Sequence, residues 1–406
     1  MAAKIRRLGD VVEKGLCIGC GACYFACSES RITLVNREDE GIRPVLDGGC
    51  RDCAGCLSIC PGYSVDGNAA TKASKATTKA SRDLGSFSEI WEGYAADPEI
   101  RSKGSSGGIL SALALYCLER EAMEFVLHTA ADPGMPWLNQ TVRSATRETL
   151  LNRTGSRYAP ASPCDGLESI QAAGKPCVFI GKPCDVAAVN SLRQNRPGLD
   201  ANIGIVLTFF CAGTPSTNGT LGLLKSFNLS KEEVGSLRYR GDGWPGEFKV
   251  VKKENGAEHC LPYSEAWSRL AKHTPLRCRL CPDGVGRVAD ISCGDAWHRT
   301  SNGTDPGWSV VIVRTSKGQD VIRKAAATGY VELIPLTPES VLAGQSRLLS
   351  KRKQLFGRLL ALALMRRARP RFVNFSLFRS WLDIPLSAKV RSVGGTVRRC
   401  LARGVK

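Results

Sequence analysis

The sequence has no long hydrophobic run. Its longest apolar stretches, residues 205–210 and 359–365, are far shorter than the roughly 20 residues that a membrane-spanning helix needs. The first ten residues are charged and no apolar segment follows them, so we expect no secretory signal. These absences predict a cytoplasmic protein. In a reducing compartment, clustered cysteines act as metal ligands or redox groups rather than as disulfides.

Histidine is scarce, and no G-x-G-x-x-G unit stands where a nicotinamide-binding fold requires one. None of the four histidines has a partner at metal-ligand spacing, so we expect structural or surface roles for His128, His259, His273 and His298. Some cysteines stand alone and are assigned no role: Cys117, Cys164, Cys177, Cys260, Cys293 and Cys400. The chemistry is therefore expected from the other twelve of the 18 cysteines.

Acidic residues are almost absent from the C-terminal end. Residues 346–406, which we call the basic tail, contain 16 Lys or Arg and one acid, Asp383, a net charge of +15. The whole chain carries +18, so the preceding 345 residues sum to only +3. A protein that grips nucleic acid through its body would not distribute its charge in this way, so no nucleic-acid partner is expected.

The basic tail combines an apolar helical stretch with basic ends between Ser350 and Pro370. One interpretation places this helix on an anionic membrane surface, at the inner membrane face, or on an acidic partner. The other packs it on the body of the protein. The residues after Ile384 are expected to be poorly ordered.

Two runs of cysteines share the spacing C-x2-C-x2-C-x3-C, and they are the strongest signal in the sequence. They comprise Cys17, Cys20, Cys23 and Cys27, and then Cys50, Cys53, Cys56 and Cys60. In two-cluster ferredoxins the fourth cysteine of each run binds the other cluster. We therefore predict one 4Fe-4S cluster on Cys17, Cys20, Cys23 and Cys60, and a second on Cys50, Cys53, Cys56 and Cys27. Structural zinc is the alternative, but it usually takes two C-x-x-C pairs.

The order of elements predicts an α/β (α+β) fold, in which a small ferredoxin-like domain precedes a mixed-sheet α/β body. Hydrophobic periodicity indicates helices over residues 107–121 and 186–192, and strands over residues 177–180, 203–210, 289–293 and 308–313. Strands that alternate with helices place ligands at the strand ends.

Four more cysteines flank the apolar segments of the body. Cys184 and Cys211 each follow a predicted strand, so they could emerge at one sheet edge, and Cys278 and Cys281 form a pair at ligand spacing. Together they could hold a third 4Fe-4S cluster, although spacing alone leaves this open.

A glycine- and serine-rich segment, Lys103-Gly-Ser-Ser-Gly-Gly108, precedes the first predicted helix. Backbone N–H groups at such a helix start can bind the pyrophosphate of a flavin dinucleotide. The candidate residues are Lys103, Ser105, Ser106, Gly107 and Gly108, with Ser156 and Tyr158 as a second contact. An ordinary capped helix start is the alternative.

Several short motifs occur together in a recognisable order. They are Ser106-Gly-Gly, Gly155-Ser-Arg-Tyr, Gly181-Lys-Pro-Cys, Arg240-Gly-Asp-Gly-Trp-Pro-Gly, Arg277-Cys-Arg-Leu-Cys-Pro-Asp and Ala289-Asp-Ile-Ser-Cys-Gly-Asp. In this order the sequence resembles the coenzyme F420 hydrogenase/dehydrogenase beta-subunit family, which includes 7-hydroxymethyl chlorophyll a reductase. The resemblance covers roughly residues 10–350.

The resemblance implies an iron-sulfur flavoprotein oxidoreductase that binds FAD. It also favours a third 4Fe-4S cluster on the four cysteines of the body. Electrons would pass between an external donor or acceptor, the clusters, FAD and an organic substrate or deazaflavin-type coenzyme. The alternative is an electron-transfer subunit that feeds a partner enzyme, for example in polysaccharide biosynthesis.

Trp244 either stacks on a substrate ring from a mobile loop or packs in a surface turn. The expected boundaries are 1–65 for the ferredoxin-type domain, 66–86 for a linker, 87–175 for the flavin part, 176–345 for the third-cluster and substrate part, and 346–406 for the basic tail.

Overall fold

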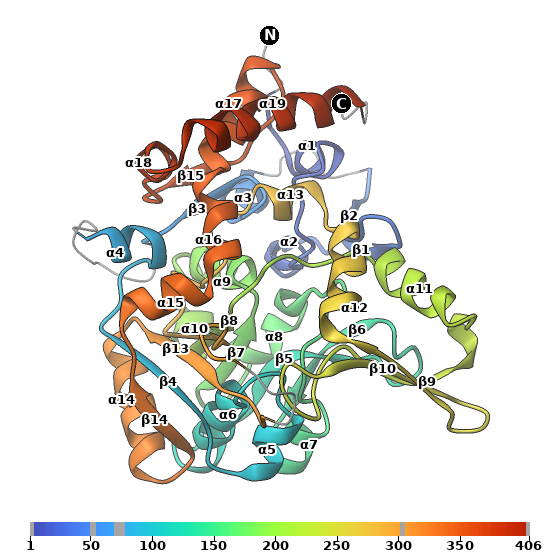
Figure 1. The fold of residues 1–406 in the computed structure, drawn as a ribbon, viewed down its shortest axis with the longest axis vertical. Helices are drawn as coiled ribbons and strands as arrows, with labels where there is room; N and C mark the ends of the chain where they lie inside the picture. The colour runs from blue at the N-terminus through green and yellow to red at the C-terminus, as the bar shows by residue number, and fades with distance from the viewer. Residues whose placement is uncertain (1–3, 49–53, 69–77, 301–304, 403–406) are drawn as a thin grey trace.

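An eight-stranded mixed sheet forms the centre of the molecule (Figure 1). The computed structural model describes residues 4–48, 54–68, 78–300 and 305–402. The strands, in spatial order, are β14 (Val331–Pro335), β4 (Glu89–Ala95), β13 (Ser309–Val313), β12 (Ile291–Asp295), β8 (Ile203–Phe209), β7 (Cys177–Gly181), β5 (Val126–Ala131) and β6 (Asn139–Ser144). Neighbours β5, β7, β8 and β12 run parallel, so their carboxyl ends lie at one edge.

Helices cover both faces of this sheet, and this is why its central strands are apolar throughout. Every residue of β13 is buried, and β8 is buried up to its last residue. One face packs against α6 (Ile109–Glu119) and α14 (Ser316–Ala327). The other packs against α8 (Leu167–Gln171), α9 (Pro183–Arg193) and α10 (Pro197–Asn202).

The predicted mixed α/β fold is confirmed, and the predicted helices and strands differ from the observed ones mainly at their ends. The largest difference is at α9, which begins at Pro183 rather than at Val186. Proline suits the first helical position because its missing N–H would have no helical partner there. As a result Cys184 lies in the first turn of α9 instead of in a loop.

A smaller sheet packs beside the main one and carries its own core. Its strands are β9 (Val234–Arg238), β10 (Glu247–Lys252) and β11 (Glu258–Pro262), packed with α11 (Thr217–Ser226), α12 (Tyr263–Leu270), η2 (Lys231–Glu233) and η3 (Ala271–His273). The remaining elements of the body are α5 (Pro98–Lys103), α7 (Arg147–Leu151), η1 (Pro163–Gly166), α13 (Leu276–Arg279) and α15 (Pro338–Gly344).

The N-terminal segment and the basic tail meet at one end of the molecule (Figure 1). The first comprises α1 (Leu8–Glu13), α2 (Ala22–Ala26), β1 (Ile32–Arg37), β2 (Gly41–Leu46), α3 (Ala54–Ser58) and β3 (Ser64–Asp66). The second comprises α16 (Ser346–Lys353), α17 (Leu355–Leu364), β15 (Arg371–Val373), α18 (Leu377–Leu382) and α19 (Leu386–Ala402). Strands β3 and β15 pair in parallel.

The basic tail is therefore not a separate appendage, because part of it packs on the N-terminal segment. Leu355 and Leu362 pack in the same hydrophobic cluster as Cys17 and Cys60. The expectation of poor order after Ile384 is wrong, because α19 is a helix of 17 residues. Its sequence is polar on the side that packs inward, and sequence patterning alone gives no reason to bury that side.

Part of the predicted linker is structured as well. Residues 69–77 lie outside the described residues, but Lys79–Leu84 forms helix α4 with Leu84 buried. The buried Arg352 of α16 donates to Asp83 Oδ1 of α4 at 2.9 Å, and also to the carbonyl oxygens of Arg82 and Phe375. This network joins the basic tail to the start of the body. None of the helices in the described ranges is both long and apolar enough to cross a membrane.

Candidate functional site

Four N-terminal cysteines, Cys17, Cys20, Cys23 and Cys60, lie close enough together to influence one another electrostatically. Burial, followed by repulsion from Cys17 and Cys20, raises the pKa of the Cys60 thiol to about 12. Burial and repulsion from Cys17, Cys20 and Cys60 likewise raise the pKa of Cys23. Thiols with pKa values this high stay protonated at neutral pH, so metal binding would have to displace their protons.

The backbone around these thiols turns tightly. Gly19 has φ +73°, and a Cβ there would lie 2.5 Å from the carbonyl oxygen of Ile42. The N–H of Gly19 donates to Cys17 Sγ at 3.4 Å. Such N–H···S bonds tune the reduction potential of iron-sulfur clusters. The close packing of Gly19 against Ile42 therefore explains why this position of the cysteine run has no side chain.

The second predicted N-terminal cluster is seen only in part. Cys50 and Cys53 lie outside the described residues. Cys56 is buried, and its thiol donates to the carbonyl oxygen of Cys23 at 3.9 Å. Cys27 Sγ accepts from the N–H of Arg31 at 3.4 Å.

The four body cysteines form another group at the edge of the main sheet. Cys184 follows β7 and Cys211 follows the adjacent parallel strand β8, so both emerge at one edge, as the sequence suggests. Burial, and after it the thiols of Cys278 and Cys281, raises the pKa of Cys211 to about 12. Burial also raises the pKa of Cys184, with smaller contributions from Asp185, Cys211 and Cys281. The structure thus assembles these four thiols from three separate segments.

The donor set of both groups fits an iron-sulfur cluster. All the donors are thiols, and a 4Fe-4S cluster takes one thiolate on each of four irons. A single zinc ion instead needs four ligands within about 2.3 Å of one point. Among the described residues, no three His, Cys, Asp or Glu side chains lie close enough to share one metal ion.

Buried Arg277 links the N-terminal group to the body group. Its Nη2 donates to the carbonyl oxygen of Pro61, which directly follows Cys60, at 2.7 Å. Its Nη1 donates to the carbonyl oxygen of Leu280, beside Cys281, at 3.2 Å. One guanidinium therefore fixes the two cysteine groups relative to each other.

Cys164, to which sequence reasoning gave no role, forms a second link. Its backbone N–H donates to the carbonyl oxygen of Cys20 at 3.0 Å. Its thiol donates to the carbonyl oxygen of Asp185, next to Cys184, at 3.7 Å. No spacing signal in the sequence could have revealed it, because its partners lie far away along the chain.

A cavity of about 670 Å³ opens at the carboxyl ends of the parallel strands. Strand ends line it at Gly181, Phe209 and Asp295, and Cys211 forms part of its wall. The start of α6, at Gly108 and Ile109, faces the same space. The cavity therefore lies where open α/β sheets bind ligands, and one residue of the body group, Cys211, lines it.

Most of the residues predicted for the flavin site line this cavity. Ser105, Ser106, Gly108, Ser156 and Tyr158 all contribute to its wall. The Oγ of Ser105 accepts a hydrogen bond from the N–H of Ser156 at 2.8 Å, which joins the two predicted flavin segments.

Lys103 and Gly107 do not line the cavity, and their roles at a flavin stay predictions. The Lys103 ammonium pairs with Glu99 at 2.8 Å, one helical turn back along α5. The N–H of Gly107 donates to Ser309 Oγ at 2.9 Å, so that donor is already used. Its close approach to β4 and β13 explains the glycine, because a Cβ there would lie 2.6 Å from the carbonyl oxygen of Gly93 and 2.8 Å from the backbone nitrogen of Ser309.

The cavity carries more positive than negative charge. Its basic residues are Arg153, Arg157, Lys182, Arg240 and Arg347, and its acidic residues are Asp185 and Asp295. Lys182 pairs with Asp185 at 2.8 Å, and Arg240 pairs with Asp295 at 2.7 Å. Within the described part of the chain, Arg153 and Arg347 have no carboxylate partner. Sequence analysis missed both, and their charge suits an anionic ligand.

Trp244 packs inside the protein and does not face a ligand. It is 2% exposed, and its Nε1 donates to Asp295 Oδ1 at 2.9 Å. Trp297 stacks on it at a centroid distance of 5.2 Å, is 38% exposed and lines the cavity. Tyr263 lies parallel to Trp297 within 8°. Trp297, which sequence analysis did not single out, is therefore among the aromatic rings that line the cavity, whereas Trp244 is not.

His128 on β5 also lines the cavity and should make stability depend on pH. Burial, and then the charge of Arg153, lowers its pKa from 6.5 to about 4. Between these values the unfolded chain binds more protons, so stability should fall as the pH drops from 6.5 to 4, by up to about 3 kcal/mol. Denaturant unfolding of the wild type and of His128→Gln should show this loss in the wild type alone. His273→Gln, an exposed control, should behave as the wild type; equal loss in all three proteins would contradict the assignment.

Comparison with known proteins gives two family matches. The N-terminal model of the coenzyme F420 hydrogenase/dehydrogenase beta subunit matches residues 90–167, and the C-terminal model of the same subunit matches residues 174–339. Together they span more than half of the chain.

Individual relatives agree with these matches. The coenzyme F420 hydrogenase subunit beta of Methanococcus voltae is 27% identical over 257 residues, which cover 61% of this chain and 85% of that subunit. The coenzyme F420-dependent sulfite reductase of Methanocaldococcus jannaschii is 24% identical over 335 residues, 78% of this chain and 47% of that protein. A solved chain of the F420-reducing NiFe hydrogenase complex from Methanosarcina barkeri aligns with a TM-score of 0.53 and 27% identity, covering 67% of this chain and 90% of that one.

Proposed function

The chain belongs to the coenzyme F420 hydrogenase/dehydrogenase beta-subunit family, and on this premise we propose that it is an iron-sulfur flavoprotein oxidoreductase. Electrons pass between an external redox partner, two N-terminal 4Fe-4S clusters, a third cluster in the body, FAD, and an organic substrate or deazaflavin-type coenzyme. The relatives are named as hydrogenase and formate dehydrogenase subunits and as a sulfite reductase, which are oxidoreductases.

The position of Cys211 carries this proposal. Cys211 belongs to the body group of cysteines and also lines the cavity. A cluster held by Cys184, Cys211, Cys278 and Cys281 would therefore stand beside whatever the cavity binds. Lys182, which pairs with Asp185 and lies close enough to Cys184 and Cys211 to influence them electrostatically, would add a positive charge between cluster and ligand.

The cavity residues have clear tasks toward a bound flavin. The volume of about 670 Å³ falls within the usual range of 300–1,000 Å³ for ligand sites. The start of α6 and the cations Arg153 and Arg347 favour an anionic pyrophosphate. When bound, a flavin exchanges hydride with an organic partner and single electrons with clusters. Trp297 and Tyr263 offer a flat aromatic surface where that partner can stack.

The proposal is tested by anaerobic purification followed by reconstitution with iron, sulfide and FAD. We expect about four irons for each cluster, and flavin absorbance that bleaches when the clusters are reduced. A protein that takes up iron but retains no flavin would contradict the oxidoreductase proposal. It would favour the alternative of an electron-transfer subunit that feeds a partner enzyme. A reconstituted protein that reduces an organic acceptor without added subunits would rule that alternative out.

Two arginines provide a sharper test of the flavin site. Arg153→Gln and Arg347→Gln should each weaken FAD binding about tenfold, the loss expected when one charge-assisted hydrogen bond is removed. Arg143→Gln is the matched control, because Arg143 is exposed on β6 and does not line the cavity. FAD retention is measured by equilibrium dialysis of the reconstituted proteins. Equal affinity of all three variants would place the pyrophosphate elsewhere.

A further inference from the structure

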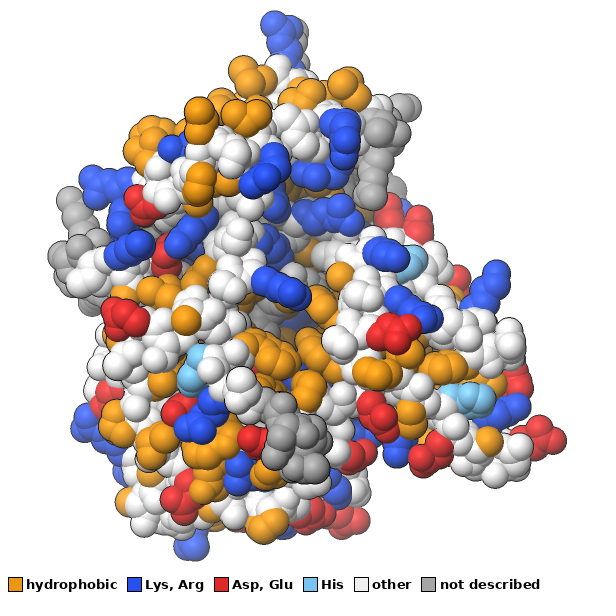
Figure 2. Space-filling view, in the orientation of Figure 1, with side chains coloured by type: hydrophobic (Ala, Val, Ile, Leu, Met, Phe, Trp, Pro, Cys, Tyr) orange, Lys and Arg blue, Asp and Glu red, His pale blue; other side chains and the backbone are white. Residues whose placement is uncertain are grey.

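The exposed large hydrophobic side chains of this protein are concentrated at one end of the molecule. Of fourteen such residues in the described ranges, seven lie between residues 364 and 401: Leu364, Val373, Phe378, Leu382, Leu386, Val390 and Leu401. They come from α17, β15, α18, α19 and the turns beside them. We call this surface the apolar end. Figure 2 shows hydrophobic side chains interspersed with Lys and Arg over the helices at this end.

Helix α19 has its apolar stripe on the outside. At 100° per residue, five apolar residues fall within about 80° of one another around the helix axis. They are Leu386, Val390, Val393, Val397 and Leu401. Leu386 is 74% exposed and Leu401 is 71% exposed. Val390 is 63% exposed, while Val393 and Val397 are half-buried, so the stripe is open toward both ends of the helix and partly covered in its middle.

The inward side of α19 carries small polar residues instead. Ser392 Oγ donates to the carbonyl oxygen of Lys389 at 2.7 Å, and Thr396 Oγ1 donates to that of Ser392 at 2.8 Å, so both hydroxyls are satisfied locally. This side fits closely on α17, where a Cβ on Gly357 would lie 2.0 Å from Ser392 Oγ. The tight fit sets the orientation of the helix, and the outward apolar stripe follows from it.

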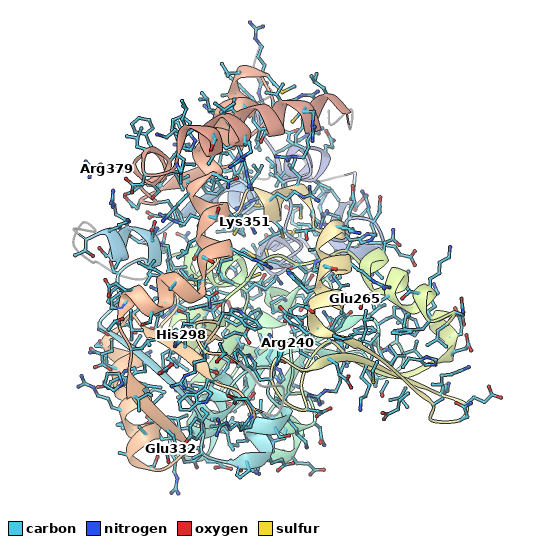
Figure 3. The ribbon with its side chains drawn as sticks, viewed as in Figure 1. Arg240, Glu265, His298, Glu332, Lys351 and Arg379 are labelled. Atoms are coloured by element: carbon cyan, nitrogen blue, oxygen red, sulfur yellow. The ribbon has the colours of Figure 1, made fainter. Side chains whose placement is uncertain are left out.

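Basic residues surround the stripe. From residue 366 onward, nine described basic residues form no ion pair with any described residue: Arg366, Arg367, Arg369, Arg371, Arg379, Lys389, Arg391, Arg398 and Arg399. Lys389 lies on one flank of the stripe, and Arg391 and Arg398 lie on the other. Arg379 points away from the body at the outer edge of α18 (Figure 3). The one acid in the tail, Asp383, pairs with Arg82 at 3.4 Å.

We propose that the apolar end docks on the surface of a lipid bilayer with anionic headgroups. An apolar stripe with basic flanks is the arrangement of helices that lie in the plane of a membrane interface. The stripe would enter the boundary between headgroups and acyl chains, while Lys389, Arg391 and Arg398 reach the phosphates. The 17 residues of α19 span about 26 Å and lie across the end of the molecule, so the whole helix can touch a flat surface (Figure 1).

Vesicle co-sedimentation of the full chain tests the proposal. A tail-deletion variant is unsuitable for this test, because the tail completes the hydrophobic core around the N-terminal cysteines. The wild type should bind vesicles that contain phosphatidylglycerol and should bind pure phosphatidylcholine much less. The double variant Leu386→Glu/Val390→Glu should lower the partition coefficient at least about tenfold. Its control is Ile334→Glu, which is 44% exposed on β14 in the body and should bind as the wild type does.

A second pair of variants tests the charge. Arg391→Ser/Arg398→Ser should lower binding to anionic vesicles roughly fivefold for each arginine. Lys225→Ser/Lys317→Ser removes two exposed lysines from the body and should leave binding unchanged. Circular dichroism and iron content should be the same in all variants. The proposal is wrong if the wild type binds no vesicles, or if a test variant binds anionic vesicles as well as its control variant does. In that case the apolar end binds another occupant, such as an acidic protein.

Discussion

Cys211→Ser should remove about four irons per chain and leave FAD bound but disconnected from the N-terminal clusters. Cys211 belongs both to the body group of thiols and to the cavity wall. With that cluster lost, reduction of the flavin through the N-terminal clusters should slow to the rate of direct chemical reduction. Iron analysis and stopped-flow absorbance of the flavin, with a reduced ferredoxin as donor, measure the two effects.

Cys293→Ser is the control for this experiment. Cys293 lines the same cavity and is buried, but only burial raises its pKa, to about 12, with no contribution from other thiols. This variant should keep its full iron content and its rate of flavin reduction. Equal iron loss in both variants would point to a general loss of structure, and full iron in Cys211→Ser would exclude a cluster at this position.

Arg240→Met should lower the free energy of unfolding by about 3–5 kcal/mol, the cost of breaking a buried ion pair. Arg240 is 2% exposed and donates to both carboxylate oxygens of Asp295, at 2.7 and 3.0 Å. Burial lowers its pKa, but Asp295 more than offsets this, so the pKa of Arg240 is raised overall. The substitution leaves Asp295 without its charge partner beneath the stack formed by Trp244 and Trp297.

Urea unfolding monitored by tryptophan fluorescence measures this effect. The double variant Arg240→Met/Asp295→Leu should recover much of the loss, because no uncompensated charge remains. Arg269→Met is the control, since Arg269 pairs with Glu265 one turn away on the exposed side of α12. It should cost only about 0.3–0.5 kcal/mol. If Arg240→Met lowered the free energy of unfolding by as little as Arg269→Met does, the buried ion pair would contribute no more to stability than an exposed one.

Local patterns were enough to predict the features that depend on neighbours in sequence. Runs of buried apolar residues located β7, β8 and β13, and strand ends followed by cysteine placed Cys184 and Cys211 at one edge. The doubled cysteine spacing predicted that Cys17, Cys20 and Cys23 lie near Cys60. In each case the physical reason lies within a few residues of the signal or in the known order of parallel strands.

Other features depend on the particular partner that a side chain or backbone group takes. Lys103 was expected at a phosphate, but its ammonium turns back to Glu99. Gly107 was expected to offer its N–H to a ligand, but Ser309, some 200 residues later, accepts that bond. The order of α19 likewise depends on its fit against Gly357. Ser309 and Gly357 lie far from Gly107 and α19 or outside their local pattern, and the spacing of Lys103 and Glu99 does not show which partner the ammonium takes.

The parallel pairing of β3 with β15 has a consequence for how the protein is made. Residues 64–66 find their strand partner only at residues 371–373, and the core around Cys17 and Cys60 is completed by Leu355 and Leu362. Domains usually fold in order as they leave the ribosome. Here Cys17 and Cys60 must wait for residues about 300 positions later before their surroundings close. Cluster insertion is therefore expected only after residue 373 has been synthesised, with the nascent thiols exposed until then to oxygen and to competing metals.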